Sequence, residues 1–272
     1  AAQNGHEAVV RLLLAHAAID ANQATQTGST PLYIAAQNGH EAVVRLLLAH
    51  AAVDPNQARP DGVTPLYMAA QKGHEAVVKL LLAHAAVDPN QAEEDGCTPL
   101  FIAAMHNQEA VVCLLLAHPA VDAERADRWS RTPLLIACEN RSTAAALALL
   151  DAKADPNARA NDGDSPLVVA RRGDNAQLLA ALVAAGADVT ALYAPLVAKC
   201  MLGDAHAARR LLLEAPAPEP PGAARDGEEG GLPPLVVACL RGDAAALAAL
   251  DGSDACEARA DGLPPAFCFA AE

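Results

Sequence analysis

The stretch TPLYIAAQNGHEAVVRLLLAHAAVDPNQARPDGV, residues 30–63, decides the fold, because it returns almost letter for letter as TPLYMAAQKGHEAVVKLLLAHAAVDPNQAEEDGC at residues 64–97. The same frame continues more loosely from later starts at Thr98, Thr132, Ser165, Ala194 and Pro233. Such self-similarity is typical of repeat proteins, in which one unit cannot bury its apolar face alone and stacks on its neighbours. The chain is therefore expected to form a row of packed units.

One unit carries the signals of two short helices and a loop. Pro31 lies where the first turn of a helix needs no N–H, and a Gly follows as a left-handed stop, so residues 31–38 should form the first helix. The run EAVVRLLLAH is apolar on two flanks, and Glu41 and Arg45 pair on the solvent-exposed side. This pattern predicts a second helix with neighbours on both flanks. The remainder, VDPNQARPDGV, carries Asp-Pro and Asp-Gly turn signals and should project as a hairpin loop.

The pattern TPL-x-x-AA-x-x-GH-E-x-VV-x-LLL resembles the ankyrin repeat family, whose units carry T-P-L-H-x-A at a 33-residue period. The resemblance covers nearly the whole chain, although Tyr33, Tyr67, Phe101 or Leu135 replaces the family His, and the first units have 34 residues. Tetratricopeptide repeats share the 34-residue period, but their W-x2-L-G-x2-Y pattern is absent. The resemblance implies an all-α solenoid of helix-turn-helix units with projecting hairpin loops.

The unit boundaries make residues 1–272 one ankyrin-like domain. It comprises a partial unit 1–29, regular units 30–63, 64–97, 98–131 and 132–164, degenerate units 165–193, 194–232 and 233–263, and the start of a truncated unit, 264–272. Both ends cut through a unit, and solenoids need polar capping units, so we expect a monomeric piece of a longer chain. Pro, Gly and Glu are dense at 214–232, which predicts a mobile insertion loop, either a hinge or a tolerated surface insertion.

Composition narrows the class of partner. Apolar residues make up 53% of the chain but aromatic residues only 3%, which suits small close-packed helices. The formal net charge of −14 repels nucleic acid and anionic membranes, and leaves basic or neutral proteins as partners. The seven Cys are odd in number and form no CxxC pair, which predicts a reducing, cytoplasmic location without disulfides or structural zinc.

No residue set predicts catalysis, a cofactor or a metal ion. P-loop, GxGxxG, GxSxG and kinase motifs are absent. Seven of the nine His occupy two repeated slots, about 10 Å apart from unit to unit, so they form a row and no metal cluster; we interpret them as helix caps. They are His6, His40 and His74, and His16, His50, His84 and His118. Cys138, Cys200 and Cys239 replace a small buried residue and should pack in the core.

The resemblance implies where a partner binds, because ankyrin proteins usually dock partners on the hairpin tips and the first-helix face. Carried over position by position, the variable slots flank the loop Gly and precede the inter-helix Gly. They hold Gln26, Thr27, Ser29, Gln37, Asn38, Pro60, Asp61, Val63, Gln71, Lys72, Glu94, Asp95, Met105, His106, Arg128, Trp129 and Arg131. Cys97 occupies such a slot as well. Ser130 replaces the usual loop Gly, which leaves the geometry of that hairpin open.

Three features of this surface each have two interpretations. Trp129, between two Arg residues, is either a binding hot spot or a cover over an apolar step of the stack. The aromatic residues at the slot of Tyr33 form either a docking stripe or packing between first helices, and the regular recurrence favours packing. The acidic tip 93–95 either meets a basic partner or is a solvated face.

These predictions favour a scaffold without enzyme activity, which binds a partner protein through the concave face and hairpin tips. The alternative is a regulatory or substrate-recruiting ankyrin segment of a larger enzyme, ubiquitin-ligase adaptor or channel. Sequence beyond Ala1 and Glu272 would separate the two hypotheses.

Overall fold

A computed structural model of the chain describes residues 1–16, 18–173 and 175–188. The predicted units 194–232 and 233–263, the insertion loop 214–232, the segment 264–272, and Cys200 and Cys239 lie outside the described residues. The described part contains helices and turns and no strand, so the predicted all-α repeat fold is confirmed.

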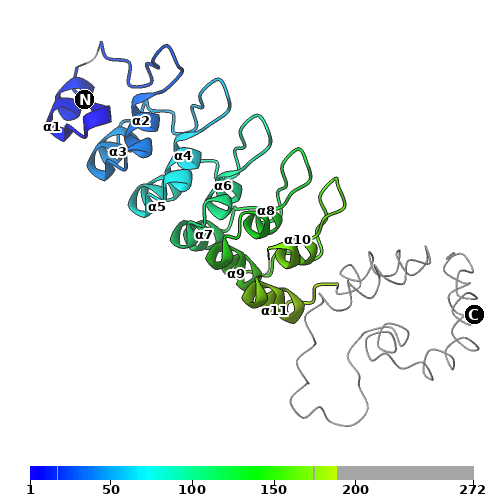
Figure 1. Cartoon of the computed structure of the whole chain (residues 1–272). Coiled ribbons are helices and arrows are strands. Elements are labelled where there is room, and N and C mark those ends of the chain that lie inside the picture. Colours follow the sequence, from blue (N-terminus) through cyan, green and yellow to red (C-terminus); the bar gives the residue numbers. More distant parts are fainter. Residues whose placement is uncertain (17, 174, 189–272) are drawn as a thin grey trace, which may run out of the picture. The chain divides into compact units, whose positions relative to one another are not determined.

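The helices come in pairs, and a loop separates each described pair from the next (Figure 1). The chain starts with a 3-10 turn at Ala2–Asn4 and α1 at Glu7–Leu14. The pairs that follow are α2 (Pro31–Gln37) and α3 (Glu41–Leu48), α4 (Pro65–Lys72) and α5 (Glu75–Leu82), α6 (Pro99–Met105) and α7 (Glu109–Leu116), α8 (Pro133–Glu139) and α9 (Thr143–Asp151), and α10 (Pro166–Arg172) and α11 (Ala176–Ala184).

Each first helix begins at the Pro of its unit because the residue before it is a cap. The buried Thr98 has an extended backbone, and its Oγ1 accepts the N–H of Phe101 at 3.2 Å. Thr30, Thr64, Thr132 and Ser165 make the same bond. A hydroxyl cap satisfies an N–H that a helix leaves unpaired, and Pro has no N–H to satisfy. The Pro predicted the start of each first helix, whereas the cap was not predicted.

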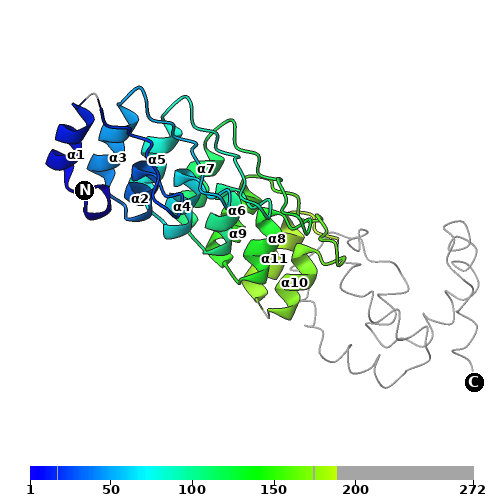
Figure 2. The same cartoon turned by 90° about the horizontal axis from the view of Figure 1, so that it is seen from above.

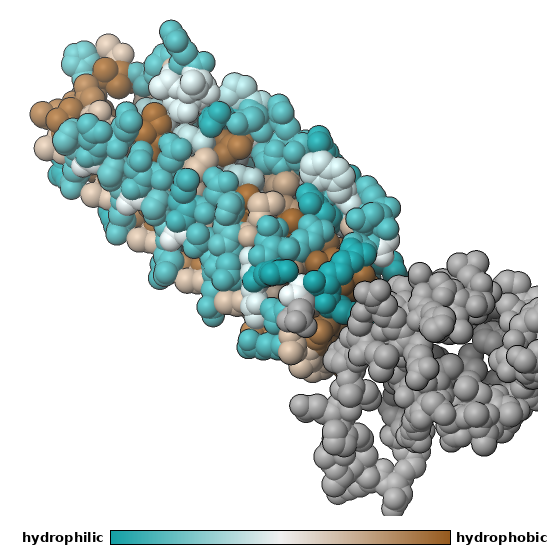
Figure 3. Space-filling view, viewed as in Figure 1, coloured by the Kyte–Doolittle hydropathy of each residue, from teal (hydrophilic) through white to brown (hydrophobic). Residues whose placement is uncertain are grey.

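First helices pack on first helices, and second helices on second helices, so the described units form two rows (Figure 2). The effect of stacking is visible where one sequence, EAVVRLLL, occurs in both α1 and α3. Leu47 of α3 is 1% exposed, whereas its counterpart Leu13 in α1 is 42% exposed. The difference arises because α3 packs between α1 and α5. The exposed side of α1 gives the apolar patch at the N-terminal end in Figure 3.

The aromatic slot of the first helices serves packing. Tyr33, Tyr67 and Phe101 are 2%, 8% and 0% exposed. Burial of an aromatic side chain removes a large apolar area from water and stabilises the fold. The packing interpretation is confirmed, and the docking stripe was wrong.

A ladder of Asn side chains joins successive units at the loops. Asn56 donates to the carbonyl of Ala86 at 2.5 Å and accepts the N–H of Asp88 at 2.9 Å. Asn22, Asn90 and Asn157 bond the next unit in the same two ways. Each such pair satisfies two main-chain groups and fixes the spacing of neighbouring units.

Histidines form a second ladder between the helix pairs. Nε2 of His40 lies 2.9 Å from the carbonyl oxygen of Gln3, and Nε2 of His74 lies 3.0 Å from that of Gln37. Neither side chain caps its own helix, so the predicted capping role is wrong for these residues. Gly39 leaves room for the ring of His74, because a Cβ on residue 39 would lie 2.8 Å from Nδ1 of that ring.

Replacing Glu124 with Asn is expected to raise the free energy of unfolding by about 1 kcal/mol, the net value of one hydrogen bond. Glu124 stands in the Asn ladder and accepts the N–H of Asp155 at 2.9 Å, but a carboxylate cannot donate the second bond. In the next unit Asn157 makes both. Urea unfolding measures the change. The matched change Asn56→Asp removes a donor and should lower the free energy of unfolding. An unchanged free energy of unfolding in E124N would contradict the stabilising role of the ladder.

Candidate partner-binding surface

A tight hairpin loop precedes each Thr-Pro or Ser-Pro start. The hairpins span residues 25–29, 59–63, 93–97, 127–131 and 160–164. In the third, the N–H of Glu93 bonds the carbonyl of Cys97, and the N–H of Gly96 (φ 88) bonds the carbonyl of Glu93 at 2.9 Å. Ser130 has a φ of 61, and its N–H makes the equivalent bond to Asp127 at 3.0 Å. The fourth hairpin therefore keeps the left-handed turn without Gly, at some steric cost.

Main-chain hydrogen bonds also join neighbouring hairpin tips. The N–H groups of Glu94, Arg128 and Asn161 donate to the carbonyls of Asp61, Asp95 and Trp129, at 3.2, 2.9 and 2.9 Å. Pro60 holds the donor position of the second hairpin and has no N–H, so hairpin 25–29 lacks this bond. The tips from 59–63 to 160–164 thus form one ordered edge, which projects beside the first helices (Figure 1).

None of the predicted contact residues is buried. Those on hairpins are Gln26, Thr27, Ser29, Pro60, Asp61, Val63, Glu94, Asp95, Arg128, Trp129 and Arg131, and those at first-helix ends are Gln37, Asn38, Gln71, Lys72, Met105 and His106. They follow the row of units and do not converge on one point. Cys97, placed in the same kind of slot, is only 7% exposed. Its placement on the contact surface was wrong, because its main chain closes the hairpin onto Glu93 and its side chain turns inward.

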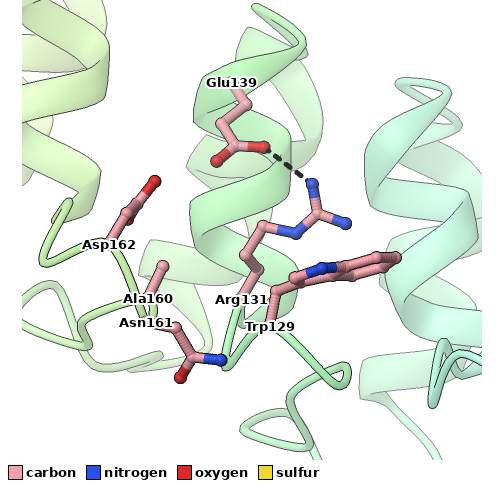
Figure 4. A pocket seen from close by; sticks show the side chains of 6 residues that line it. All are labelled: Trp129, Arg131, Glu139, Ala160, Asn161 and Asp162. Atoms are coloured by element: carbon pink, nitrogen blue, oxygen red, sulfur yellow. Dashed lines mark hydrogen bonds and ion pairs between the residues drawn. The ribbon is translucent and has the colours of Figure 1, made fainter.

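Trp129 borders a pocket between the last two described hairpins. The pocket has a volume of about 340 Å³ and is lined by Trp129, Arg131, Glu139, Ala160, Asn161 and Asp162 (Figure 4). The indole is 39% exposed. The guanidinium carbons of Arg128 and Arg131 lie 4.1 and 4.7 Å from its ring centroid, so cation–π contacts hold the ring at the tip.

Asp127 organises this hairpin and was not among the predicted residues. Its side chain is fully buried and accepts the N–H groups of Trp129 and Arg131, both at 2.9 Å. It also pairs with the Arg131 guanidinium at 2.7 Å. An Asp that bonds main-chain groups two residues on is a common turn former, which was the available signal.

Arg131 links the hairpin to the end of α8. Its Nη1 lies 3.3 Å from Oε2 of Glu139 (Figure 4). Burial raises the pKa of Glu139 above its ordinary value, Asp162 and Asp127 raise it further, and Arg131 opposes the shift. Hairpin and helix end therefore meet in one polar site with more carboxylates than cations.

Models of the ankyrin repeat family match most of the described residues. A model of three ankyrin copies matches residues 1–59 and 51–127, and a model of one ankyrin repeat matches residues 129–161. The chain belongs to the ankyrin repeat family. The matches end at residue 161, and the structure describes one further helix pair, α10 and α11, beyond them.

The fold of this ankyrin chain is similar to a solved one. The crystal structure of EF0377, an ankyrin repeat protein, aligns with a TM-score of 0.64 and 21% identity, over 69% of this chain and 95% of that one. At this identity the likeness concerns the fold alone. No curated protein matches the chain.

The described ankyrin units offer little for other chemistry. No group of three or more His, Cys, Asp or Glu within them could hold a metal ion. Burial raises the pKa of Cys97 and Cys138 to about 12, so at neutral pH both thiols are almost wholly protonated and poor nucleophiles. Cys138 is 2% exposed, which confirms its predicted core role. None of the described helices is long and apolar enough to cross a membrane.

Proposed function

We propose that this chain is a scaffold that holds a partner protein along its row of hairpin tips and first-helix ends. The observation that carries the proposal is the ordered edge itself: hydrogen bonds join the tips from unit to unit, while their variable side chains stay out of the core. Pre-ordered loops lose little entropy on binding, so contacts spread over several units can reach useful affinity.

The proposed partner is a basic or neutral protein, and the proposed location of the chain is the cytoplasm. The net charge of −14 disfavours nucleic acid and anionic membranes. Cys97, Cys113 and Cys138 are unpaired thiols, which fits a reducing compartment. The described hairpin tips present exposed side chains for contact with such a protein.

Site-specific photo-crosslinking in host-cell extract tests the proposed face. A benzophenone amino acid at Glu94, on a tip, or at Met105, at the end of α6, should yield adducts of discrete mass. The same group at Glu75 or Lys79, exposed on α5, is the control and should yield few. Equal adducts from both faces, or adducts from α5 alone, would refute the proposed docking face.

A further inference from the structure

The pocket beside Trp129 carries an excess of negative charge. Arg131 is its one cation, and two carboxylates already share it: Asp127 at 2.7 Å and Glu139 at 3.3 Å. Asp162, on the opposite wall, accepts the N–H of Asp164 and has no cationic partner among the described residues. The residues that line this space of about 340 Å³ carry two carboxylates and one guanidinium, a net charge of −1. The buried carboxylate of Asp127, paired with Arg131, adds one more negative charge behind the lining.

The neighbouring hairpins extend the negative character along the edge. Arg59 and Arg128 are each paired with a carboxylate, at 3.2 and 2.6 Å. Among the described residues, Glu93 and Glu94 have no cationic partner. Arg159 donates to the Gly163 carbonyl and does not line the pocket. The charge left unpaired on this edge is therefore mainly negative.

The pocket also has an apolar wall suited to a long side chain. The half-exposed indole of Trp129 and the methyl group of Ala160 line it together with the carboxylates. Lys and Arg bury their hydrocarbon stems against apolar surface while the charged head reaches polar groups.

We propose that this pocket receives an Arg or Lys side chain from a basic segment of the partner protein, with the stem against Trp129 and Ala160 and the head between Glu139 and Asp162. Further basic residues of the segment lie over Glu93 and Glu94. The inference rests on the proposed function and names the chemistry of the partner. The raised pKa of Glu139 agrees with it, because a partly desolvated carboxylate with acidic neighbours is stabilised by an added cation.

Selection from a random dodecapeptide library displayed on phage, with the intact chain immobilised, tests the inference. The expected output is enriched in Arg and Lys. The tightest peptide is then synthesised, and its binding is followed by the fluorescence of Trp129, the only Trp of the chain, which reports directly from the pocket. A saturable change that weakens with added salt is expected.

The double variant Glu139→Gln, Asp162→Asn keeps the size of both side chains and removes their charge, and should weaken this peptide at least about tenfold. The control Glu75→Gln, Glu109→Gln removes two exposed carboxylates from α5 and α7 and should change affinity less than about twofold. Unchanged circular dichroism spectra show that the variants fold.

Three outcomes would overturn the inference. They are a library output that is acidic or uncharged, basic peptides that bind the double variant as well as the wild type, and a library that yields no binder. Acidic or uncharged peptides that crosslink at Glu94 would leave the scaffold function standing. Failure of the scaffold is recognised separately, by crosslinking that does not favour the hairpin face.

Discussion

Alanine in place of Leu47 is expected to lower the free energy of unfolding by about 3 kcal/mol, whereas the same change at Leu13 is expected to cost less than about 1 kcal/mol. Both residues occupy the same position of an identical helix, EAVVRLLL. Leu47 is buried between neighbouring second helices and Leu13 is not, so only Leu47→Ala leaves a cavity. Because the two helices have the same sequence, the effect of alanine on helix propensity is the same in both variants and cancels when they are compared.

Urea unfolding of both variants, followed by circular dichroism, measures the difference. Repeat arrays can unfold unit by unit, so amide exchange in α3 should accompany it and show local opening in Leu47→Ala. Equal losses for the two variants would mean that contact between units contributes little to the burial of α3, and the stacking account would fail.

Alanine in place of Trp129 is expected to weaken partner binding at least about 30-fold, which corresponds to about 2 kcal/mol, without lowering the melting temperature appreciably. The indole is exposed at the tip and holds the wall of the pocket. The bonds that build the hairpin use the main chain of Trp129 and the side chain of Asp127, and alanine keeps them.

The affinity is measured by calorimetry with the partner protein that the crosslinking at Glu94 identifies. A melting curve of the free variant is the control. The matched variant Val183→Ala removes a 49% exposed apolar side chain from α11 and should leave affinity unchanged. A large loss of stability in Trp129→Ala with unchanged affinity would favour the other interpretation, in which Trp129 covers an apolar step of the stack.

The repeat period predicted the fold because the signals that form each helix lie within one unit. Pro31 and Gly39 delimit the first helix as expected, and Glu41 pairs with Arg45 at 2.6 Å on the exposed side of the second. These are local interactions over three or four residues, and one sequence contains all the information they need.

Interactions between units were harder to predict. His74 bonds a carbonyl 37 residues earlier, and Asn56 bonds groups 30 and 32 residues later. Their partners are main-chain atoms, which every residue has, so the residue types do not identify these bonds. The ring of His74 was therefore interpreted as a local cap. The inward turn of Cys97 was missed for a related reason, since counting from the loop Gly does not give the direction of the side chain.

The contact surface was predicted by analogy of position, and it stays a prediction in the structure. None of its residues is buried, but exposure alone does not identify a ligand. The pocket could not be predicted, because it needs Glu139 of α8 and Asp162 of the next hairpin to face Trp129 across a unit boundary.

Amide hydrogen exchange of the intact chain, measured free and in the non-covalent complex with the partner that crosslinking identifies, tests the central claim most directly. The account predicts new protection at the hairpin tips 93–97, 127–131 and 160–164 and at the ends of α6 and α8, with the exposed sides of α5 and α7 unchanged. Protection confined to α5 and α7, with the tips unchanged, would contradict it.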